Sequence, residues 1–261
     1  MRKNPGKEEQ ITMETFRPIS NMAPCGAWGK SLCRLRQVAD FQYHTIVKDL
    51  RDQLGKVEGI LLDVGCGDSP YKTFLNANCR YLGIDIVDRN DRFGYNRGDI
   101  LFFDENGGIP LADGSVDCIL CTEVLEHVFD HPRLIHEMHR VLRSGGKLIL
   151  TVPWSARYHY IPHDYFRYTA SALERLFKEF SRVEIKTRGT DVTSICAKII
   201  VVCAGMSSPS NKNAMRLLLL PLSWFLTIPL VIAAIGIGHL SLLFRLGSPD
   251  DPLGYTVLLE K

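Results

Sequence analysis

Two acidic residues and a glycine-rich turn are the groups in this sequence whose types and spacing most clearly suit ligand binding. The apolar run GILLDVG contains Asp63 near its end, and Gly65 and Gly67 stand in the turn that follows. Glycines permit a tight turn and a close approach of the backbone to a ligand, while Asp63 offers a carboxylate. A second apolar run, YLGID, ends in Asp85, 22 residues after Asp63. An acidic residue at about that offset can accept hydrogen bonds from ribose hydroxyls, so we expect a nucleoside-bearing ligand.

The turn favours S-adenosylmethionine over a dinucleotide. A dinucleotide fingerprint would place its third glycine at position 70, where this chain has Pro70, and Asp68 stands near the place of a pyrophosphate. An acidic loop suits the cationic sulfonium and ammonium of S-adenosylmethionine better than two phosphates. An NAD oxidoreductase is therefore the weaker alternative.

The elements that position these groups alternate along the chain. Short apolar runs, GILLDVG, YLGID, VDCILCTEV and KLILTVP, are separated by helical segments, of which residues 131–142 have the clearest apolar face. Such a pattern is typical of a parallel sheet with helices on both faces. Before it, apolar residues at steps of three and four over residues 31–54 predict one helix.

Five segments in order resemble the class I methyltransferases, in the branch often called type 11: LLDVGCG, YLGID, GDI, IPLADGSVDCILCTEVLEHV and EMHRVLRSGGKLILTVP. The resemblance runs from Gly59 to Pro153. It implies S-adenosylmethionine as cofactor and an α/β, Rossmann-like fold: a doubly wound, mostly parallel seven-stranded sheet with helices on both faces. The chain departs from the family pattern at Ser144, where a proline is frequent, and in a short helix after the loop.

The resemblance also implies where the cofactor binds. The loop from Asp63 to Gly67 would hold its methionine part, Asp85 its ribose, and Asp99 with Ile100 its adenine. The full set of implied cofactor-binding residues is Asp63, Gly65, Cys66, Gly67, Asp85, Asp99, Ile100 and Glu123.

The segment PWSARYHYIPHDYFRYT is rich in histidine and aromatic residues and would overhang the carboxyl edge of the sheet. Transfer to a hydroxyl is helped by a positioned base, so His163 and Asp164 are the first acid–base candidates and His127 is the other. The alternative role for His163 and Asp164 is to cap the following helix or anchor the loop, and for His127 it is a purely structural one. The phrase HDYFRYT resembles family members found with bacterial surface-glycan enzymes. No metal is expected: His131, His136 and His139 lack pairing with a carboxylate at helical spacing, and the Cys118–Cys121 CxxC lacks a second pair of ligands.

A long apolar segment lies near the C-terminus. Residues 217–244 contain no Asp, Glu, Lys or Arg, which passes the length test for a transmembrane helix. The following GYTVLLEK resembles the last strand of the sheet, so a single crossing would separate it from its domain. We expect an apolar helical hairpin over about residues 214–246 that enters one leaflet or lies at its surface, with Lys212, Arg216 and Arg245 at its ends. Burial in a homodimer or on the domain is the alternative.

Composition sets the remaining expectations. The net charge is +2 with no long basic tract, which gives no support to nucleic acid as a partner. Eight scattered cysteines and an N-terminus without an apolar signal run favour a reducing, cytoplasmic compartment, with the protein peripheral or monotopic on the membrane face. We expect a flexible arm (1–28), a helical extension (29–58) and a methyltransferase domain (59–261) that carries the apolar insertion.

The leading functional hypothesis is O-methylation of a lipid-linked or surface-glycan acceptor, with a small-molecule or lipid-linked acceptor and the membrane surface as partners. A methyltransferase that acts on a prenylated quinone or another lipid is the second hypothesis. A membrane-associated protein that binds S-adenosylmethionine without turnover is the third.

Overall fold

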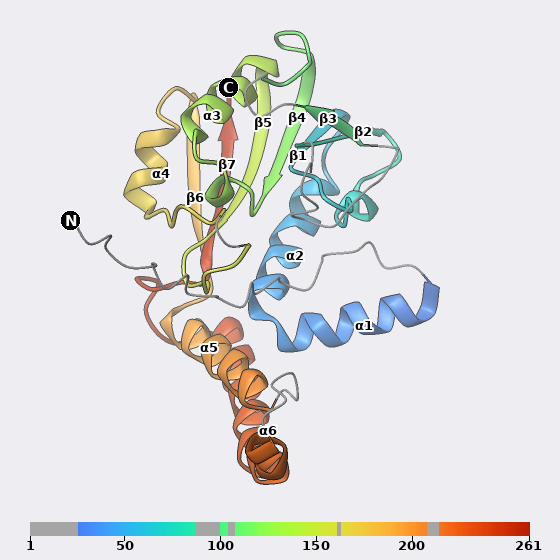
Figure 1. Cartoon of the computed structure of the whole chain (residues 1–261). Helices are drawn as coiled ribbons and strands as arrows, with labels where there is room; N and C mark the ends of the chain where they lie inside the picture. Colours follow the sequence, from blue (N-terminus) through green and yellow to red (C-terminus); the bar gives the residue numbers. More distant parts are fainter. Residues whose placement is uncertain (1–25, 87–99, 104–107, 161–162, 208–213) are drawn as a thin grey trace, which may run out of the picture.

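The computed structural model describes residues 26–86, 100–103, 108–160, 163–207 and 214–261. Within these residues, seven strands form one sheet with the order β3-β2-β1-β4-β5-β7-β6 (Figure 1). The strands are β1 (Gly59–Val64), β2 (Cys79–Ile86), β3 (Leu101–Phe103), β4 (Val116–Thr122), β5 (Leu142–Pro153), β6 (Arg182–Arg188) and β7 (Gly254–Glu260). The predicted α/β, Rossmann-like fold class is confirmed. The predicted arm over residues 1–28 lies mostly outside the described residues, and Asp99 lies wholly outside them.

The strand β1 lies inside the sheet, parallel to β2 on one side and to β4 on the other. β7 is the exception to the parallel arrangement, because it runs antiparallel to both β5 and β6. The chain moves outward from β1 to β3 and then returns to β4, so the direction of winding reverses between β1 and β4. Ligands of doubly wound sheets bind at the carboxyl ends of the strands at this point.

Helices cover both faces of the sheet, as the near-continuous apolar character of its strands requires. Met138 of α3 and Phe177, which follows α4, pack into the core on one face, and Leu50 and Leu54 of α2 pack on the other. The helices are α1 (Gly26–Ala39), α2 (Phe41–Leu54), α3 (His131–Val141), α4 (Ala170–Leu176), α5 (Asp191–Met206) and α6 (Ala214–Phe244), with short 3-10 turns η1 (Lys72–Phe74) and η2 (Leu125–His127).

The N-terminal helical region differs from the sequence prediction of one helix over residues 31–54. It consists of two helices, α1 and α2, because Asp40 has an extended backbone and caps the second one. The Asp40 carboxylate accepts a hydrogen bond from the backbone amide of Tyr43 at 3.1 Å. An aspartate in this position satisfies an otherwise unpaired amide and starts a new helix. Figure 1 shows α1 directed away from the sheet, at a large angle to α2.

The apolar insertion also differs from its prediction. The expected hairpin within residues 214–246 is wrong, because α6 is one continuous helix of 31 residues with Pro221 and Pro229 inside it. Proline kinks a helix and removes one hydrogen bond, but it does not have to end the helix. The partner of α6 is α5, which packs along it and projects with it from the sheet (Figure 1). We call this helix pair, residues 191–206 and 214–244, the α5–α6 stalk.

Candidate functional site

The turn after β1 is held against the end of β2. Both the Gly65 and Cys66 amides donate hydrogen bonds to the Ile84 carbonyl, at 2.9 and 3.1 Å. Gly65 has φ +70, and a Cβ there would lie 2.4 Å from the Val124 side chain, so this position requires glycine. Gly67 has φ +47 and open space where a Cβ would be. The turn therefore brings backbone, rather than side chains, to the carboxyl edge of the sheet.

Two carboxylates flank this turn. Asp63 is buried, and the Tyr81 hydroxyl donates a hydrogen bond to its Oδ2 at 2.7 Å. Burial raises the pKa of Asp63 to about 7; the Tyr81 hydrogen bond opposes this effect and the nearby Asp85 adds to it. Asp85 accepts hydrogen bonds from the Gly67 amide at 2.9 Å and from the Ile86 amide at 2.8 Å. The two acidic residues predicted from sequence therefore lie at one site with the glycine turn between them.

Glu123 stands directly after β4 with a left-handed backbone, φ +53, a conformation that non-glycine residues adopt mostly where the surroundings hold them in place. Its Oε1 accepts a hydrogen bond from Arg188 Nη2 at 2.8 Å. Arg188 belongs to β6, its side chain has no solvent exposure, and the same nitrogen donates to the Val152 carbonyl at 3.0 Å. A buried cation from the far edge of the sheet thus fixes one wall of the site.

This arrangement fits S-adenosylmethionine. The raised pKa of Asp63 reflects a buried carboxylate that has no positive partner among the described residues, and the ammonium of the methionine part would supply one. Cys66 is buried beneath the turn, and burial raises the pKa of its thiol, so it packs as a neutral side chain. Ile100 is buried where β3 begins, beside the strand end that carries Asp85.

On the acceptor side, the predicted residues His127 and His163 lie together, whereas Asp164 has an environment of its own. His127 Nδ1 lies 2.6 Å from the His163 carbonyl oxygen, and burial lowers the pKa of His127 to about 4, so its ring is neutral at pH 7. The His163 ring is more accessible and makes a 2.9 Å hydrogen bond through Nδ1 with the Tyr165 hydroxyl. His127 therefore lies close to the backbone of His163, so the structure brings the two separate acid–base candidates together.

Asp164 has a different environment from the one expected for a base. Arg167 donates two hydrogen bonds to its carboxylate, at 2.5 and 2.8 Å, and the His159 amide donates a third at 3.0 Å. Burial acts to raise the pKa of Asp164, but these hydrogen bonds outweigh it, and the pKa lies below its ordinary value. The geometry favours the anchoring role that the sequence analysis left open, while its acid–base role stays a prediction.

Sequence reasoning missed four residues of this site: Tyr81, Glu126, His159 and Arg188. Glu126 is fully buried in η2, where burial and the Glu123 carboxylate raise its pKa well above the ordinary value. Its place in EVLEHV was the available signal, since an acidic residue follows Leu125 inside an apolar stretch. No comparable signal pointed to Arg188, because RVEIKTR alternates polar and apolar residues as an ordinary half-exposed strand does.

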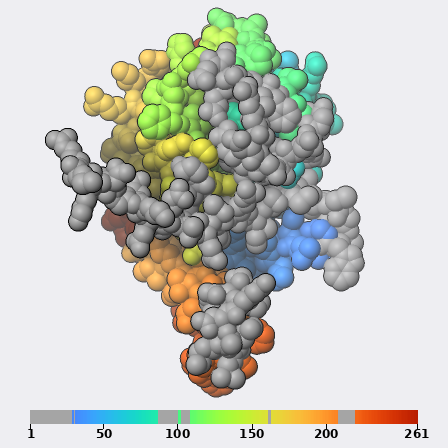
Figure 2. All heavy atoms as spheres, viewed as in Figure 1, coloured from blue at the N-terminus to red at the C-terminus, as the bar shows by residue number. Residues whose placement is uncertain are grey.

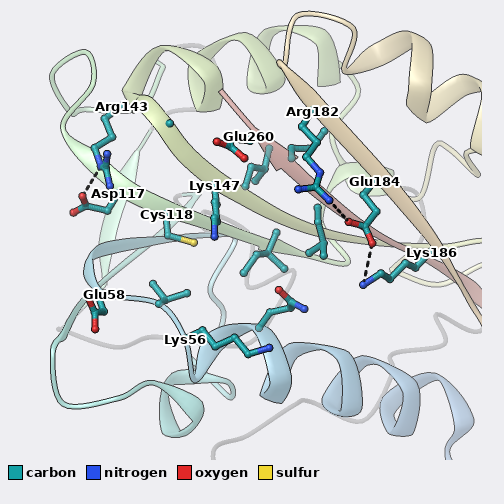
Figure 3. Close-up of a pocket in the computed structure, with 17 residues that line it drawn as sticks. Lys56, Glu58, Asp117, Cys118, Arg143, Lys147, Arg182, Glu184, Lys186 and Glu260 are labelled. Carbon is teal, nitrogen blue, oxygen red and sulfur yellow. Dashed lines mark hydrogen bonds and ion pairs between the residues drawn. The ribbon is translucent and has the colours of Figure 1, made fainter.

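A second concave surface lies at the opposite edge of the sheet, where the parallel strands begin. Figure 3 shows charged side chains of both signs around it, including Lys147 and Glu260. Several are already paired, as in the hydrogen bonds of Arg143 to Asp117 at 2.6 Å and of Arg182 to Glu184 at 3.3 Å. This surface faces away from the cofactor turn and has no part in the site.

Comparison with known proteins bears on the central part of the chain. Residues 62–150 match a family model described as a methyltransferase domain, of type 11. A probable S-adenosylmethionine-dependent methyltransferase of Mycolicibacterium smegmatis is 34% identical over 101 residues, which cover 36% of this chain and 37% of the relative. A thiol S-methyltransferase of Mus musculus is 33% identical over 113 residues, 39% of this chain and 45% of the relative. The chain thus spans less than half the length of these curated relatives.

Solved structures support the fold. A methyltransferase from Archaeoglobus fulgidus has a TM-score of 0.50 at 14% identity and covers 89% of this chain and 99% of that chain. The cyclase SpnF has a TM-score of 0.51 at 16% identity, and the match covers 95% of this chain and 86% of that chain. Because the fold also carries a cyclase, the matched sequence and the acidic glycine turn identify the domain, and the fold alone does not. Residues 62–150 thus match a methyltransferase domain, and the comparisons support S-adenosylmethionine as its cofactor.

Proposed function

We propose that this chain transfers the methyl group of S-adenosylmethionine to an oxygen atom of a lipid-linked or surface-glycan acceptor, on the cytoplasmic face of a membrane. The observation that carries the proposal is the position of the α5–α6 stalk. α5 follows the carboxyl end of β6 and α6 precedes β7, which runs antiparallel. The stalk therefore leaves the same edge of the sheet at which the cofactor turn lies.

The surface of the stalk is unusually apolar. Within residues 219–244 of α6, the most apolar 18-residue window has a mean hydropathy of 2.1, and 11% of that window is buried. Trp224, Phe225 and Ile232 are among its exposed side chains, and Ile195 and Val202 of α5 extend the same surface. In Figure 2 the stalk is the orange region that extends from the rounded body of the protein. An apolar surface of this extent is rare on proteins surrounded by water and marks contact with lipid or another protein.

The part of the stalk in which the two helices are paired has a length that suits entry into one leaflet. Near the sheet, Thr193 Oγ1 lies 3.0 Å from Ser241 Oγ, and at the far end Ser207 Oγ lies 2.8 Å from Thr227 Oγ1. Ser241 follows Thr227 by 14 positions, which correspond to about 21 Å of helix. The hydrocarbon core of a bilayer is about 30 Å thick, so the paired part exceeds one leaflet but does not span two. Both ends of the stalk return to the sheet, so no part of the domain has to cross the membrane.

Exposed groups near the stalk fit the headgroup region. α1 exposes Leu32 and Leu35 together with Arg34, and Arg245 is exposed where α6 ends. Val38 of α1 is tied to the stalk, because its carbonyl oxygen lies 2.9 Å from His239 Nε2. Basic side chains beside apolar ones favour the surface of an anionic membrane. A membrane in this position would present lipid-linked acceptors to the edge that holds the cofactor.

Flotation with liposomes of phosphatidylethanolamine and phosphatidylglycerol tests the membrane part. The full chain should float with the liposomes, and the variant Phe225→Glu with Ile232→Glu should stay in the dense fraction. Phe129→Glu is the matched control, because Phe129 on the body is 75% exposed and Phe225 is 77% exposed. Equal flotation of all three proteins, or a stable soluble dimer that covers the stalk, would contradict this part of the proposal.

Transfer of a tritiated methyl group into separated lipid and water-soluble glycan extracts tests the acceptor. Label should enter the lipid-linked fraction as an ether that resists mild alkali, since an O-methyl ether is stable where a methyl ester is cleaved. Label only in proteins, or only in amines, would overturn the assignment of an oxygen acceptor.

A further inference from the structure

Three side chains beside the cofactor site form a compact cluster that methyl transfer alone does not explain. Glu126 and His127 belong to η2, after β4, and His159 lies in the segment after β5. One nitrogen or carboxylate oxygen from each lies within 4.8 Å of the others. The side chains of Glu126, His127 and His159 are 0%, 10% and 12% exposed, so the cluster is largely enclosed.

Glu126 is the unusual member of this cluster. Both of its carboxylate oxygens are buried, and neither has a hydrogen-bond partner among the described residues. The His127 Nε2 atom lies 3.7 Å from Glu126 Oε1, which is too long for a hydrogen bond. A buried carboxylate without a partner is costly, so one that persists calls for a cation or another ligand.

The two histidines are oriented by their second nitrogen atoms. His127 Nδ1 donates to the His163 carbonyl oxygen at 2.6 Å, which leaves the lone pair on Nε2. His159 Nδ1 lies 2.9 Å from the Arg157 carbonyl oxygen and 3.0 Å from Asp164 Oδ2. Metal-binding histidines characteristically donate their other N–H to a carbonyl or carboxylate in this way. The anchored Asp164 carboxylate thus holds the His159 ring in its orientation.

We propose that Glu126, His127 and His159 bind a divalent transition-metal ion of the zinc class. Two imidazoles and one carboxylate form a donor set that such ions favour, and three protein ligands leave a coordination position for a substrate. Ligands about 2.1 Å from the ion would lie closer together than they do here, so binding would contract the cluster.

The metal site rests on geometry alone, whereas its role rests on the proposed methyl transfer. The cluster adjoins Glu123, which lines the cofactor site, so an ion there would face the acceptor. A coordinated hydroxyl ionises more readily than a free one. Its O–H bond breaks and the proton passes to water, the oxygen attacks the methyl carbon, and the carbon–sulfur bond breaks to release neutral S-adenosylhomocysteine. His127 would then act as a metal ligand and not as the base.

The test is calorimetric titration of Zn²⁺ into the full chain in detergent, after treatment with a chelator. We expect one ion per chain. Glu126→Gln and His159→Ala should each weaken binding at least about tenfold, while His136→Ala, an exposed histidine on α3, should bind as the unmodified protein does. Circular dichroism of each variant checks its fold, and the nearly isosteric Glu126→Gln guards against loss of binding through unfolding.

Titration with Co²⁺ identifies the ligands, because the chain also has free cysteines. Visible bands of a nitrogen and oxygen site that disappear in Glu126→Gln would support the proposal. A sulfur-to-cobalt charge-transfer band, an absence of binding, or equal binding by all variants would overturn it. Titration of S-adenosylmethionine into the same preparation separates the two proposals. Cofactor binding without metal binding would refute the metal site and leave methyl transfer standing, while the reverse would support the metal site alone.

Discussion

Replacing Arg188 with methionine tests how the candidate site is held in place. Arg188 is fully buried, and its guanidinium donates to Glu123 Oε1 at 2.8 Å and to the Val152 carbonyl oxygen at 3.0 Å. Methionine keeps much of the volume but leaves the Glu123 carboxylate without its cation. Removing one partner of a buried ion pair costs about 3–5 kcal/mol. We therefore expect Arg188→Met to lower the free energy of unfolding by that amount and to weaken binding of S-adenosylmethionine.

The assay is equilibrium unfolding in urea, followed by tryptophan fluorescence in a constant concentration of detergent. With a slope of about 3 kcal/mol per molar urea, the midpoint should fall by roughly 1 M or more. Arg182→Met is the matched control on the same strand, because the Arg182 side chain is 70% exposed and its pair with Glu184 contributes less than about 1 kcal/mol. Adding Glu123→Gln to Arg188→Met should recover part of the loss, since it removes the unpaired charge.

Equal midpoints for Arg188→Met and Arg182→Met would refute this reasoning. The buried arginine would then be dispensable, and the left-handed backbone of Glu123 would need another explanation. The proposed pairing would also be contradicted if the double variant lost more unfolding free energy than the two single variants lose together.

Two further predictions concern the cofactor turn. The affinity for S-adenosylmethionine should rise with pH through about 7 and level off above it, because the raised pKa of Asp63 leaves its carboxyl protonated at lower pH. Calorimetry on Asp63→Asn should show an affinity that depends less on pH. An unchanged pH dependence in this variant would exclude Asp63 as its cause. Gly65→Ala should weaken cofactor binding and lower the free energy of unfolding by about 1–3 kcal/mol, because of φ +70 and the 2.4 Å approach to Val124; wild-type values in calorimetry and urea unfolding would contradict it.

The sheet and its cofactor turn could be predicted because their signals are local. A strand buried on both faces is a short, continuous apolar run, and the turn between such a strand and a helix needs glycine where the backbone approaches a ligand. Asp63 and Asp85 terminate such runs, and the parallel pairing of β1 with β2 brings their ends together. Helix α3 was predicted over residues 131–142 and is observed at His131–Val141.

The stalk was mispredicted because its pairing is not local. Pro221 and Pro229 suggested a break inside the apolar segment, although they only interrupt single hydrogen bonds of α6. The true partner, α5, contains Lys198 and follows a strand, so it reads as an ordinary helix of the domain. Contacts between residues far apart in the sequence, such as Thr193 with Ser241 and Ser207 with Thr227, reveal the pair.

The acceptor side was predicted in part for a similar reason. His127, His163 and Asp164 were selected because polar side chains stand out in otherwise apolar or aromatic surroundings. Arg188 contacts Glu123 from a distant strand, and nothing in the sequence around either residue predicts that contact. His159 lies in the same segment as Asp164, but the sequence does not show that its ring also approaches Glu126 and His127. The absence of a metal was expected from helical spacing, a rule that does not apply to ligands gathered from a short turn and a separate loop.

The central claim is that the turn from Asp63 to Gly67, with Asp85, binds S-adenosylmethionine. Calorimetric titration of the full chain with S-adenosylmethionine and with NAD tests it most directly, with Asp85→Asn as the variant. We expect one S-adenosylmethionine per chain, at least about tenfold weaker binding in Asp85→Asn from the loss of hydrogen bonds to a charged group, and no binding of NAD. Binding of NAD without S-adenosylmethionine, or equal affinity in Asp85→Asn, would contradict the account.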